Sequence, residues 1–289
     1  MSGLKPVTVP DVRAAKGQTP LVMVTAYDAP TARIADDAGV DLILVGDSVA
    51  MVVLGYDDTL QVTIEDMAHH TAAVARTHPR ALVVGDLPWM SYHQGANDAV
   101  GNAAKLIRAG AKSVKLEGGA KRVPVIGAIV DAEIPVMGHL GLTPQSVHAL
   151  GGFKVQGRTA EAARLLIADA RALVEAGVFA IVLECVPDDV ATLVTEAVPV
   201  PTIGIGAGST CDGQVLVMHD LLGLEDRVTP RFVRRYAEMK SDGVEAVARY
   251  AADVRARTFP GPNEGYRLPG DAAEELGLYG GSGHASMSA

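Results

Sequence analysis

The chain has 289 residues, of which 48% are hydrophobic and 20% charged, so it can bury a large core and is not intrinsically disordered. Its 34 acidic residues against 25 basic ones give a formal net charge of −9, which disfavours binding to nucleic acid or to an anionic membrane surface. Two cysteines, Cys185 and Cys211, exclude a disulfide framework, a cysteine zinc site and a CxxC redox pair.

The N-terminal stretch does not resemble a targeting segment. It lacks the continuous apolar run of a secretory signal and carries Asp11, an acidic residue that a transit peptide avoids. The longest stretch without Asp, Glu, Lys or Arg, residues 134–153, contains Gly, Pro, His, Gln, Ser and Thr, so it is not a membrane helix. The sequence therefore predicts a cytoplasmic protein.

Short runs rich in Val, Ile and Leu recur along the chain, and each is typical of a buried strand. Because they are apolar throughout, they indicate a parallel sheet covered on both faces. The runs are LVMVT (21–25), DLILVG (41–46), ALVVGD (81–86), SVKLEG (113–118), PVMGHL (135–140), AIVLEC (180–185), PTIGIG (201–206) and QVLVMH (214–219).

Segments with helix end signals separate most of these strands. One helix is predicted from Thr159, which suits an N-cap, to Gly177, which suits the position just past the last turn. Comparable start signals stand at Thr143-Pro144 and Thr229-Pro230, and comparable end signals at Gly39 and Gly110.

Eight strands alternating with helices predict a closed (β/α)8 barrel, the TIM barrel. A doubly wound sheet with a dinucleotide site should show G-x-G-x-x-G after the first strand, where residues 25–28 read TAYD instead. The late GIGAG (204–208) has Ser209 where the third glycine would fall, so we interpret it as a strand and a tight turn. We expect an N-terminal segment (1–20), the barrel domain with its C-terminal helices (21–260), and a tail (261–289) whose last dozen residues are mobile.

Polar residues follow most of the predicted strands. In a barrel the carboxyl ends of the strands converge on the active site, so these residues are the candidates for chemistry. They are Tyr27 and Asp28, Asp47 and Ser48, Asp86, Lys115 and Glu117, His139, and Glu184.

Three of the acids, Asp47, Asp86 and Glu117, come from successive strands. Oxygen donors without thiolates suit a hard cation that keeps waters and accepts substrate oxygens, and Mg²⁺ is the first choice. The alternative is that each acid caps the helix after its strand. The adjacent His69 and His70 lie on a predicted helix without an HExxH motif, which favours a surface or packing role.

Lys115 and Glu117 share one face of their strand, since strand side chains alternate. A lysine in an acidic mouth could bind a substrate carboxylate, form a Schiff base, or pair with neighbouring acids. Glu184 ends an apolar strand, where loss of hydration would raise its pKa toward that of a general base. It could instead interact with the N-terminus of the next helix, which begins at Pro187. Cys185 would point to the opposite side and suits packing. Together, the strand-end acids, Lys115 and Glu184 suggest a metal-assisted reaction through an enolate.

The same segments resemble the ketopantoate hydroxymethyltransferase family. The resemblance covers about residues 20 to 260 and rests on many motifs in order. They are TAYD (25–28), LVGDS (44–48), GYDDT (55–59), DLPWMSY (86–92), VKLEGG (114–119), GHLGLTPQSV (138–147), GGFKVQGR (151–158), LECVP (183–187), and GIGAG with CDGQVLVMHD (204–220).

The resemblance implies transfer of a one-carbon unit from 5,10-methylenetetrahydrofolate to 3-methyl-2-oxobutanoate, which yields 2-dehydropantoate for pantothenate and coenzyme A. It implies that Asp47, Asp86 and Glu117 hold Mg²⁺, that Asp47, Ser48, Asp86 and Lys115 contact the oxo acid, and that Glu184 accepts the proton. It also implies a homo-oligomer, a decamer in bacterial members. The chain departs from the family after Phe259-Pro260-Gly261, where its tail is longer.

Three alternatives remain from the sequence. Another Mg²⁺-dependent 2-oxo acid enzyme of the isocitrate lyase or phosphoenolpyruvate mutase type would share the enolate chemistry, but its Lys-Lys-Cys-Gly-His loop is absent. A Schiff-base aldolase would use Lys115. A binding protein would use the acids only as helix caps.

Overall fold

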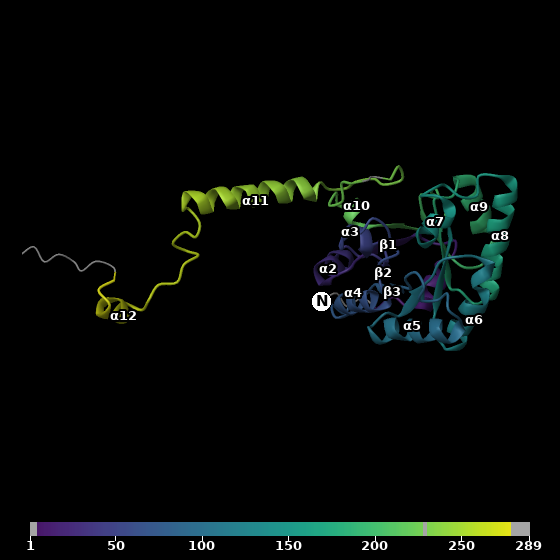
Figure 1. The fold of residues 1–289 in the computed structure, drawn as a ribbon, viewed down its shortest axis with the longest axis horizontal. Helices are drawn as coiled ribbons and strands as arrows, with labels where there is room; N and C mark the ends of the chain where they lie inside the picture. The colour runs from purple at the N-terminus through teal and green to yellow at the C-terminus, as the bar shows by residue number, and fades with distance from the viewer. Residues whose placement is uncertain (1–4, 228–229, 279–289) are drawn as a thin grey trace, which may run out of the picture. The chain divides into compact units, whose positions relative to one another are not determined.

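Eight parallel strands pair in chain order and close on themselves in the computed structural model, which describes residues 5–227 and 230–278 (Figure 1). The predicted (β/α)8 barrel is confirmed, and each predicted apolar run overlaps one strand. The strands are β1 (Leu21–Thr25), β2 (Leu42–Val45), β3 (Leu82–Asp86), β4 (Ser113–Lys115), β5 (Val136–Gly141), β6 (Ala180–Glu184), β7 (Thr202–Ile205) and β8 (Gly213–Leu216).

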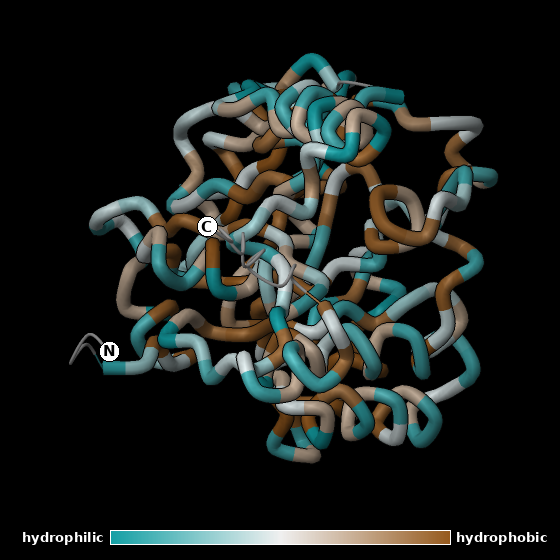
Figure 2. Tube along the Cα trace, turned by 90° about the vertical axis from the view of Figure 1, so that its left-hand side faces the viewer, coloured by the Kyte–Doolittle hydropathy of each residue, from teal (hydrophilic) through white to brown (hydrophobic). Residues whose placement is uncertain are grey.

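The strands bury side chains on both faces, as their apolar composition requires. One set fills the inside of the barrel, where Leu42 and Leu44 of β2 pack with Leu82 and Val84 of β3. The alternate residues, such as Ile43 and Val83, pack outward against helices. Hydrophobic residues therefore lie on the strands and on the helices that pack against them. Figure 2 colours each residue along the chain by its hydropathy.

Helices surround the barrel and pack against one another in chain order. The long ones are α2 (Ala29–Asp37), α4 (Ile64–Ala75), α5 (Ala96–Arg108), α6 (Val123–Asp131), α8 (Ala160–Glu175) and α9 (Asp188–Ala197). The short ones are α3 (Val49–Val52), α7 (Val147–Leu150), α10 (Met218–Leu221) and two 3₁₀ turns, η1 (Ala120–Arg122) and η2 (Pro144–Ser146).

Most predicted helix ends are confirmed. The Thr159 side chain accepts a hydrogen bond from the backbone of Ala162 at the start of α8, and Gly39, Gly110 and Gly177 have positive φ just past their helices. Thr143-Pro144 begins only η2 and the single turn of α7. The predicted start at Thr229-Pro230 is wrong: Thr229 lies outside the described residues, and residues 230–238 contain turns but no helix.

The ring of helices is interrupted between β7 and β8. Residues 206–212 connect these strands without a helix, and GIGAG is a strand followed by a turn, as interpreted from the sequence. Gly206 has φ 65° and lies so close to Phe232 that an added Cβ would meet the ring at 2.6 Å. Val22 on β1 is 50% exposed.

A short N-terminal helix closes the opposite end of the barrel from the strand-end acids. Helix α1 (Val9–Ala14) begins with a capping box in which Thr8 and Asp11 each accept a hydrogen bond from the other's backbone N–H. Its Val12 is fully buried in the cluster that fills the barrel. The T-x-x-D spacing was a usable sequence signal for this helix, which the sequence analysis missed.

Asp212 ties this end of the barrel together. Its carboxylate accepts hydrogen bonds from Lys16 Nζ at 2.9 Å, from the Gly17 backbone N–H at 2.9 Å and from the Thr202 backbone N–H at 2.9 Å. Lys16 also donates to the carbonyl of Thr195. The segment after α1 is thereby attached to α9, to β7 and to the residue that precedes β8.

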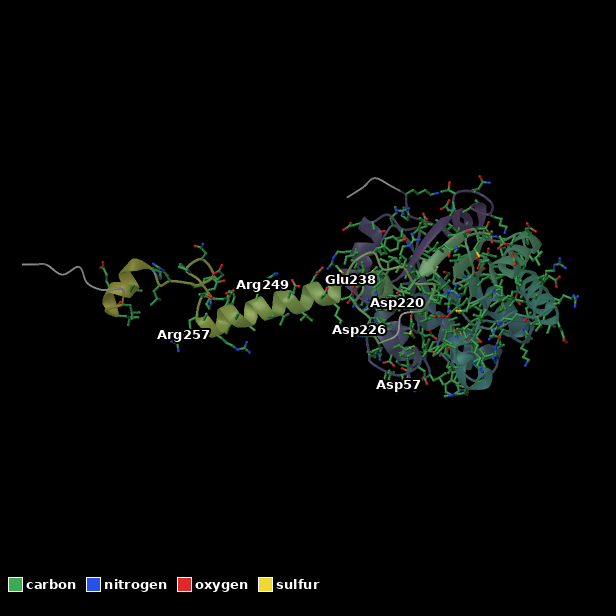
Figure 3. The ribbon with its side chains drawn as sticks, turned by 90° about the horizontal axis from the view of Figure 1, so that it is seen from above. Asp57, Asp220, Asp226, Glu238, Arg249 and Arg257 are labelled. Carbon is green, nitrogen blue, oxygen red and sulfur yellow. The ribbon has the colours of Figure 1, made fainter. Side chains whose placement is uncertain are left out.

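A second compact unit begins at Glu238. Its helix α11 (Met239–Ala256) is continuous, carries Arg249 and ends before Arg257, and α12 (Gly270–Glu275) follows (Figure 3). None of the residues of α11 is buried, and Val244, Val247 and Tyr250 are 62%, 67% and 55% exposed. The domain boundary at residue 260 stays a prediction, and the predicted mobile end (279–289) lies outside the described residues.

No helix within the described residues combines the length and the hydropathy that crossing a membrane requires.

We predict that Asp212→Asn lowers the free energy of unfolding by about 2 kcal/mol or more at neutral pH, because it leaves the Lys16 ammonium and the buried Thr202 N–H without a charged acceptor. Burial opposes the charge, but bonds from Thr202, Lys16 and Gly17 outweigh it and hold the pKa of Asp212 below its usual 3.8. The contribution is therefore complete above that value and is lost as the pH falls through the folded-state pKa. Urea unfolding against pH measures it.

The exposed Asp131→Asn at the end of α6 is the control and should change stability by less than about 0.5 kcal/mol. An Asp212→Asn variant as stable as this control would show that the cluster contributes no net stability.

Candidate active site

The carboxyl ends of four adjacent strands place charged side chains inside the barrel. Asp86 follows Leu82 and Val84 on the inward face of β3 and is paired in register with Lys115 of β4. Lys115, His139 of β5 and Glu184 of β6 continue the inward series, and Glu117 follows just past β4. All are buried except Glu184, whose side chain is 16% exposed. The barrel is thus apolar in its middle and ionic at one mouth.

Lys115 is held by Asp86. Its Nζ lies 2.7 and 2.8 Å from the two carboxylate oxygens of Asp86. Burial disfavours the ammonium, but Asp86, Glu117 and Asp47 outweigh burial and raise the pKa of Lys115. A lysine that is kept charged is a poor nucleophile, so this geometry favours ion pairing over the Schiff-base alternative.

Asp47 and Ser48 lie in the turn after β2, beside the Asp86–Lys115 pair. The Asp47 backbone N–H donates to Asp86 Oδ2 at 3.2 Å. Burial, and then the charge of Asp86, raise the pKa of Asp47 to about 7. The Ser48 hydroxyl is 2.8 Å from the hydroxyl of the buried Tyr27, which fixes its position.

Glu117, His139 and Glu184 face one another with polar atoms unsatisfied. His139 Nδ1 is 3.6 Å from Glu117 Oε1, and its Nε2 is 3.3 Å from Glu184 Oε2. Neither ring nitrogen nor Glu117 Oε1 has a hydrogen-bond partner, although all three atoms are buried. Burial, and then the charge of Asp47, raise the pKa of Glu117 well above its usual range. Buried polar atoms are normally paired, so these atoms mark a place for a ligand.

Two neutral residues that sequence reasoning missed, Gln145 and Tyr92, connect the acids. Gln145 Nε2 donates to Asp47 Oδ2 at 2.9 Å, and the Gln145 backbone N–H donates to Glu117 Oε2 at 3.1 Å. The Tyr92 hydroxyl donates to Gln145 Oε1 at 2.6 Å. An uncharged amide after β5 and a tyrosine in the β3 loop carry no sequence signal of such a role.

The donor set suits Mg²⁺. Asp47, Asp86 and Glu117 offer carboxylate oxygens, the Lys115 charge lowers the pKa of Asp47 and of Glu117 but does not outweigh burial, and Glu117 Oε1 is a buried oxygen without a hydrogen-bond partner. Within the described residues, no three His, Cys, Asp or Glu side chains already converge in a metal-binding arrangement. Mg²⁺ commonly takes only one or two carboxylates and completes its shell with water and substrate oxygens. The three acids therefore remain the candidate ligands.

The helix-cap alternative is wrong for these acids. The N-cap positions of the helices after β2, β3 and β4 are Ser48, Gly95 and Arg122, and none makes a side-chain capping bond. Asp28, in contrast, caps α2 by accepting from the Thr31 backbone.

The other candidates, His69, His70 and Cys185, have no contact that indicates a catalytic role within the described residues. His69 is exposed, and His70 Nδ1 donates to the Tyr27 carbonyl at 2.7 Å, which supports the turn after β1. Burial, and then the nearby Glu184 charge, raise the pKa of Cys185 to about 11, which makes it a weak nucleophile.

Comparison with known sequences finds one family over most of the chain. A family model described as ketopantoate hydroxymethyltransferase matches residues 6–262. The 3-methyl-2-oxobutanoate hydroxymethyltransferase of Oleidesulfovibrio alaskensis is 58% identical over 266 residues, covering 92% of both chains. That of Syntrophobacter fumaroxidans is 56% identical over 271 residues, covering 93% of this chain and 96% of its own.

Among solved structures, the phosphoenolpyruvate phosphomutase of Streptomyces platensis subsp. rosaceus superposes with a TM-score of 0.59 at 15% identity, covering 93% of this chain and 95% of its own. This likeness shows a common fold. The alternative enzyme type considered from the sequence therefore shares the barrel, whereas the close sequence relatives lie in another family.

Gly141 should be required for the placement of Glu184. It has φ 92°, it is paired in register with Glu184, and an added Cβ would meet the Glu184 carbonyl oxygen at 2.2 Å. We predict that Gly141→Ala lowers the free energy of unfolding by about 2 kcal/mol or more, from strain and the clash. Urea unfolding measures this loss, and a crystal structure would show β6 displaced.

Gly127→Ala is the matched control, since this glycine lies in α6 with nothing within 4 Å of an added Cβ. It should stabilise the chain by up to about 1 kcal/mol. Equal stabilities of the two variants would contradict the close approach.

Proposed function

The chain belongs to the ketopantoate hydroxymethyltransferase family, and from this membership and the acidic barrel mouth we propose that it forms 2-dehydropantoate for pantothenate and coenzyme A synthesis. The hydroxymethyl group comes from 5,10-methylenetetrahydrofolate and is joined to C3 of 3-methyl-2-oxobutanoate. The C3–H bond and both bonds from the methylene carbon to the folate nitrogens break, a C–C bond forms to that carbon, and water supplies the hydroxyl. The proton from C3 and the second hydrogen of the water balance the two N–H bonds of the tetrahydrofolate that leaves. The single observation that carries the proposal is identity of 56 to 58% over more than nine-tenths of the chain.

Asp47, Ser48, Asp86 and Lys115 are proposed to bind the oxo acid. An ammonium has three N–H bonds, and those of Lys115 that point to Asp86 leave at least one for a substrate oxygen. The Ser48 hydroxyl, held by Tyr27, is a second donor on the same side. Asp86 keeps the lysine charged and aimed.

Asp47, Asp86 and Glu117 are proposed to hold Mg²⁺. When bound, the ion would polarise the 2-oxo group and offset the buried negative charge. Asp47 and Glu117, whose pKa values are raised, would have to lose any protons they hold, so binding should strengthen as the pH rises.

Glu184 is proposed as the general base that removes the C3 proton. It ends β6 on the inward face, it is the most accessible of the mouth carboxylates, and it lies opposite His139. A carboxylate at the open side of the cluster can accept a proton without losing an existing hydrogen bond. No step is assigned to His139.

We predict that Glu184→Gln lowers kcat by about 10²- to 10⁴-fold while the dissociation constant of the oxo acid changes little, because the amide keeps the shape but cannot accept the proton. Steady-state formation of 2-dehydropantoate and calorimetric titration of the oxo acid measure the two effects. EDTA should abolish turnover, and added Mg²⁺ should restore it.

Glu175→Gln, an exposed residue at the end of α8, is the matched control and should keep full activity. Turnover of Glu184→Gln within about threefold of this control would overturn the assignment of the base.

The chain is also proposed to be a homo-oligomer. Val244, Val247 and Tyr250 of α11 are exposed, which supports this proposal, since a helix whose apolar side chains are not buried is marginal in water. Light scattering after size exclusion should give a mass several times 30.0 kDa. A monomer would contradict the proposal. The cytoplasmic location and the decamer stay predictions.

A further inference from the structure

Gln145 bridges two candidate metal ligands that come from different strands. Asp47 follows β2 and accepts a hydrogen bond from the Gln145 side chain, and Glu117 follows β4 and accepts one from the Gln145 backbone N–H. Gln145 is 5% exposed, and its Nε2 also donates to the Leu87 carbonyl at 3.0 Å. Both amide hydrogens therefore have acceptors, and the side chain has one orientation.

Tyr92 fixes which way the amide faces. The Glu117 backbone N–H donates to the Tyr92 hydroxyl at 3.2 Å, so the hydroxyl hydrogen is left to point at Gln145 Oε1, 2.6 Å away. Tyr92 is 1% exposed, and the Arg122 guanidinium lies 5.5 Å from the centre of its ring. A flipped Gln145 amide would place its carbonyl oxygen against the Asp47 carboxylate and the Leu87 carbonyl. All of these atoms are acceptors, so the flipped orientation would lose both hydrogen bonds.

The network leaves one oxygen of each carboxylate available. Gln145 engages Asp47 Oδ2 and Glu117 Oε2, while Asp47 Oδ1 and Glu117 Oε1 accept no hydrogen bond from the described part of the chain. Two like charges in a buried site would otherwise turn away from each other. A neutral donor holds both without supplying the positive charge that would compete with a cation.

We propose that Gln145, locked by Tyr92, is a positioning residue that aims Asp47 and Glu117 at the divalent cation. The inference rests on the proposed function, because it assumes that these acids hold the metal. Gln145 acts through the carboxylates and does not touch the reacting atoms. Tyr92 acts through Gln145.

The test is Mn²⁺ binding to the full chain without substrate, followed by electron paramagnetic resonance, for wild type, Gln145→Met, Tyr92→Phe and the double variant. Gln145→Met should weaken binding by about 10- to 100-fold, as loss of an outer-shell partner does. Tyr92→Phe should weaken it less. The double variant should be no weaker than Gln145→Met alone, because both changes remove one pathway.

Kinetics give a second readout that a purely structural role would not move. The apparent activation constant for Mg²⁺ should rise in parallel with the Mn²⁺ dissociation constant, and saturating Mg²⁺ should recover most of the lost turnover. Gln18→Met and Tyr266→Phe, both exposed, are matched controls that should bind Mn²⁺ as wild type does.

Three outcomes separate the two proposals. Wild-type chain that neither binds Mn²⁺ nor turns over would defeat the proposed function. Wild-type binding and turnover with unchanged binding in Gln145→Met would defeat this inference alone. If Gln145→Met does not fold, Tyr92→Phe, which removes a single oxygen atom, decides: unchanged Mn²⁺ affinity would overturn the inference.

Discussion

Buried negative charge is the constraint on which this site depends. Asp47, Asp86, Glu117 and Glu184 lie at one mouth of the barrel, and the charge of Lys115 lowers the pKa of both Asp47 and Glu117. Carboxylates in a poorly hydrated site repel each other strongly. Lys115 offsets part of this negative charge. Gln145 donates hydrogen bonds to two of the carboxylates, and Tyr92 orients Gln145. The carboxylate oxygens that remain without a donor could bind a divalent cation. Each proposed role follows from this excess of buried negative charge over positive charge.

The barrel separates the residues that hold the fold together from those that bear the charge. The inside is filled with apolar side chains, and α1 with Val12 closes the end opposite the acids. There Asp212 collects donors from three parts of the chain, which is a stabilising arrangement because its charge is fully paired. The unpaired charge is confined to the strand ends, where a closed parallel barrel always brings side chains from adjacent strands together.

The barrel and the charged part of the site could be predicted from the sequence because both depend on local patterns. Apolar runs specify buried parallel strands, and an acid at the end of such a run must point into the mouth or away from it. Gln145 could not be predicted, because its partners lie 98 and 28 residues away and an amide carries no charge signal. The predicted helix start at Thr229-Pro230 was wrong because tertiary contacts override the local signal. Phe232 packs on Gly206, and the Tyr236 N–H donates to the Leu221 carbonyl.

We propose that Glu184 and a divalent cation at the barrel mouth together remove the C3 proton of the oxo acid. Proton NMR of 3-methyl-2-oxobutanoate in deuterium oxide, without folate, measures this step alone. We expect exchange at C3 that requires Mg²⁺, stops with EDTA and is absent in Glu184→Gln. Exchange that persists in Glu184→Gln, or no wild-type exchange even with tetrahydrofolate added, would contradict it.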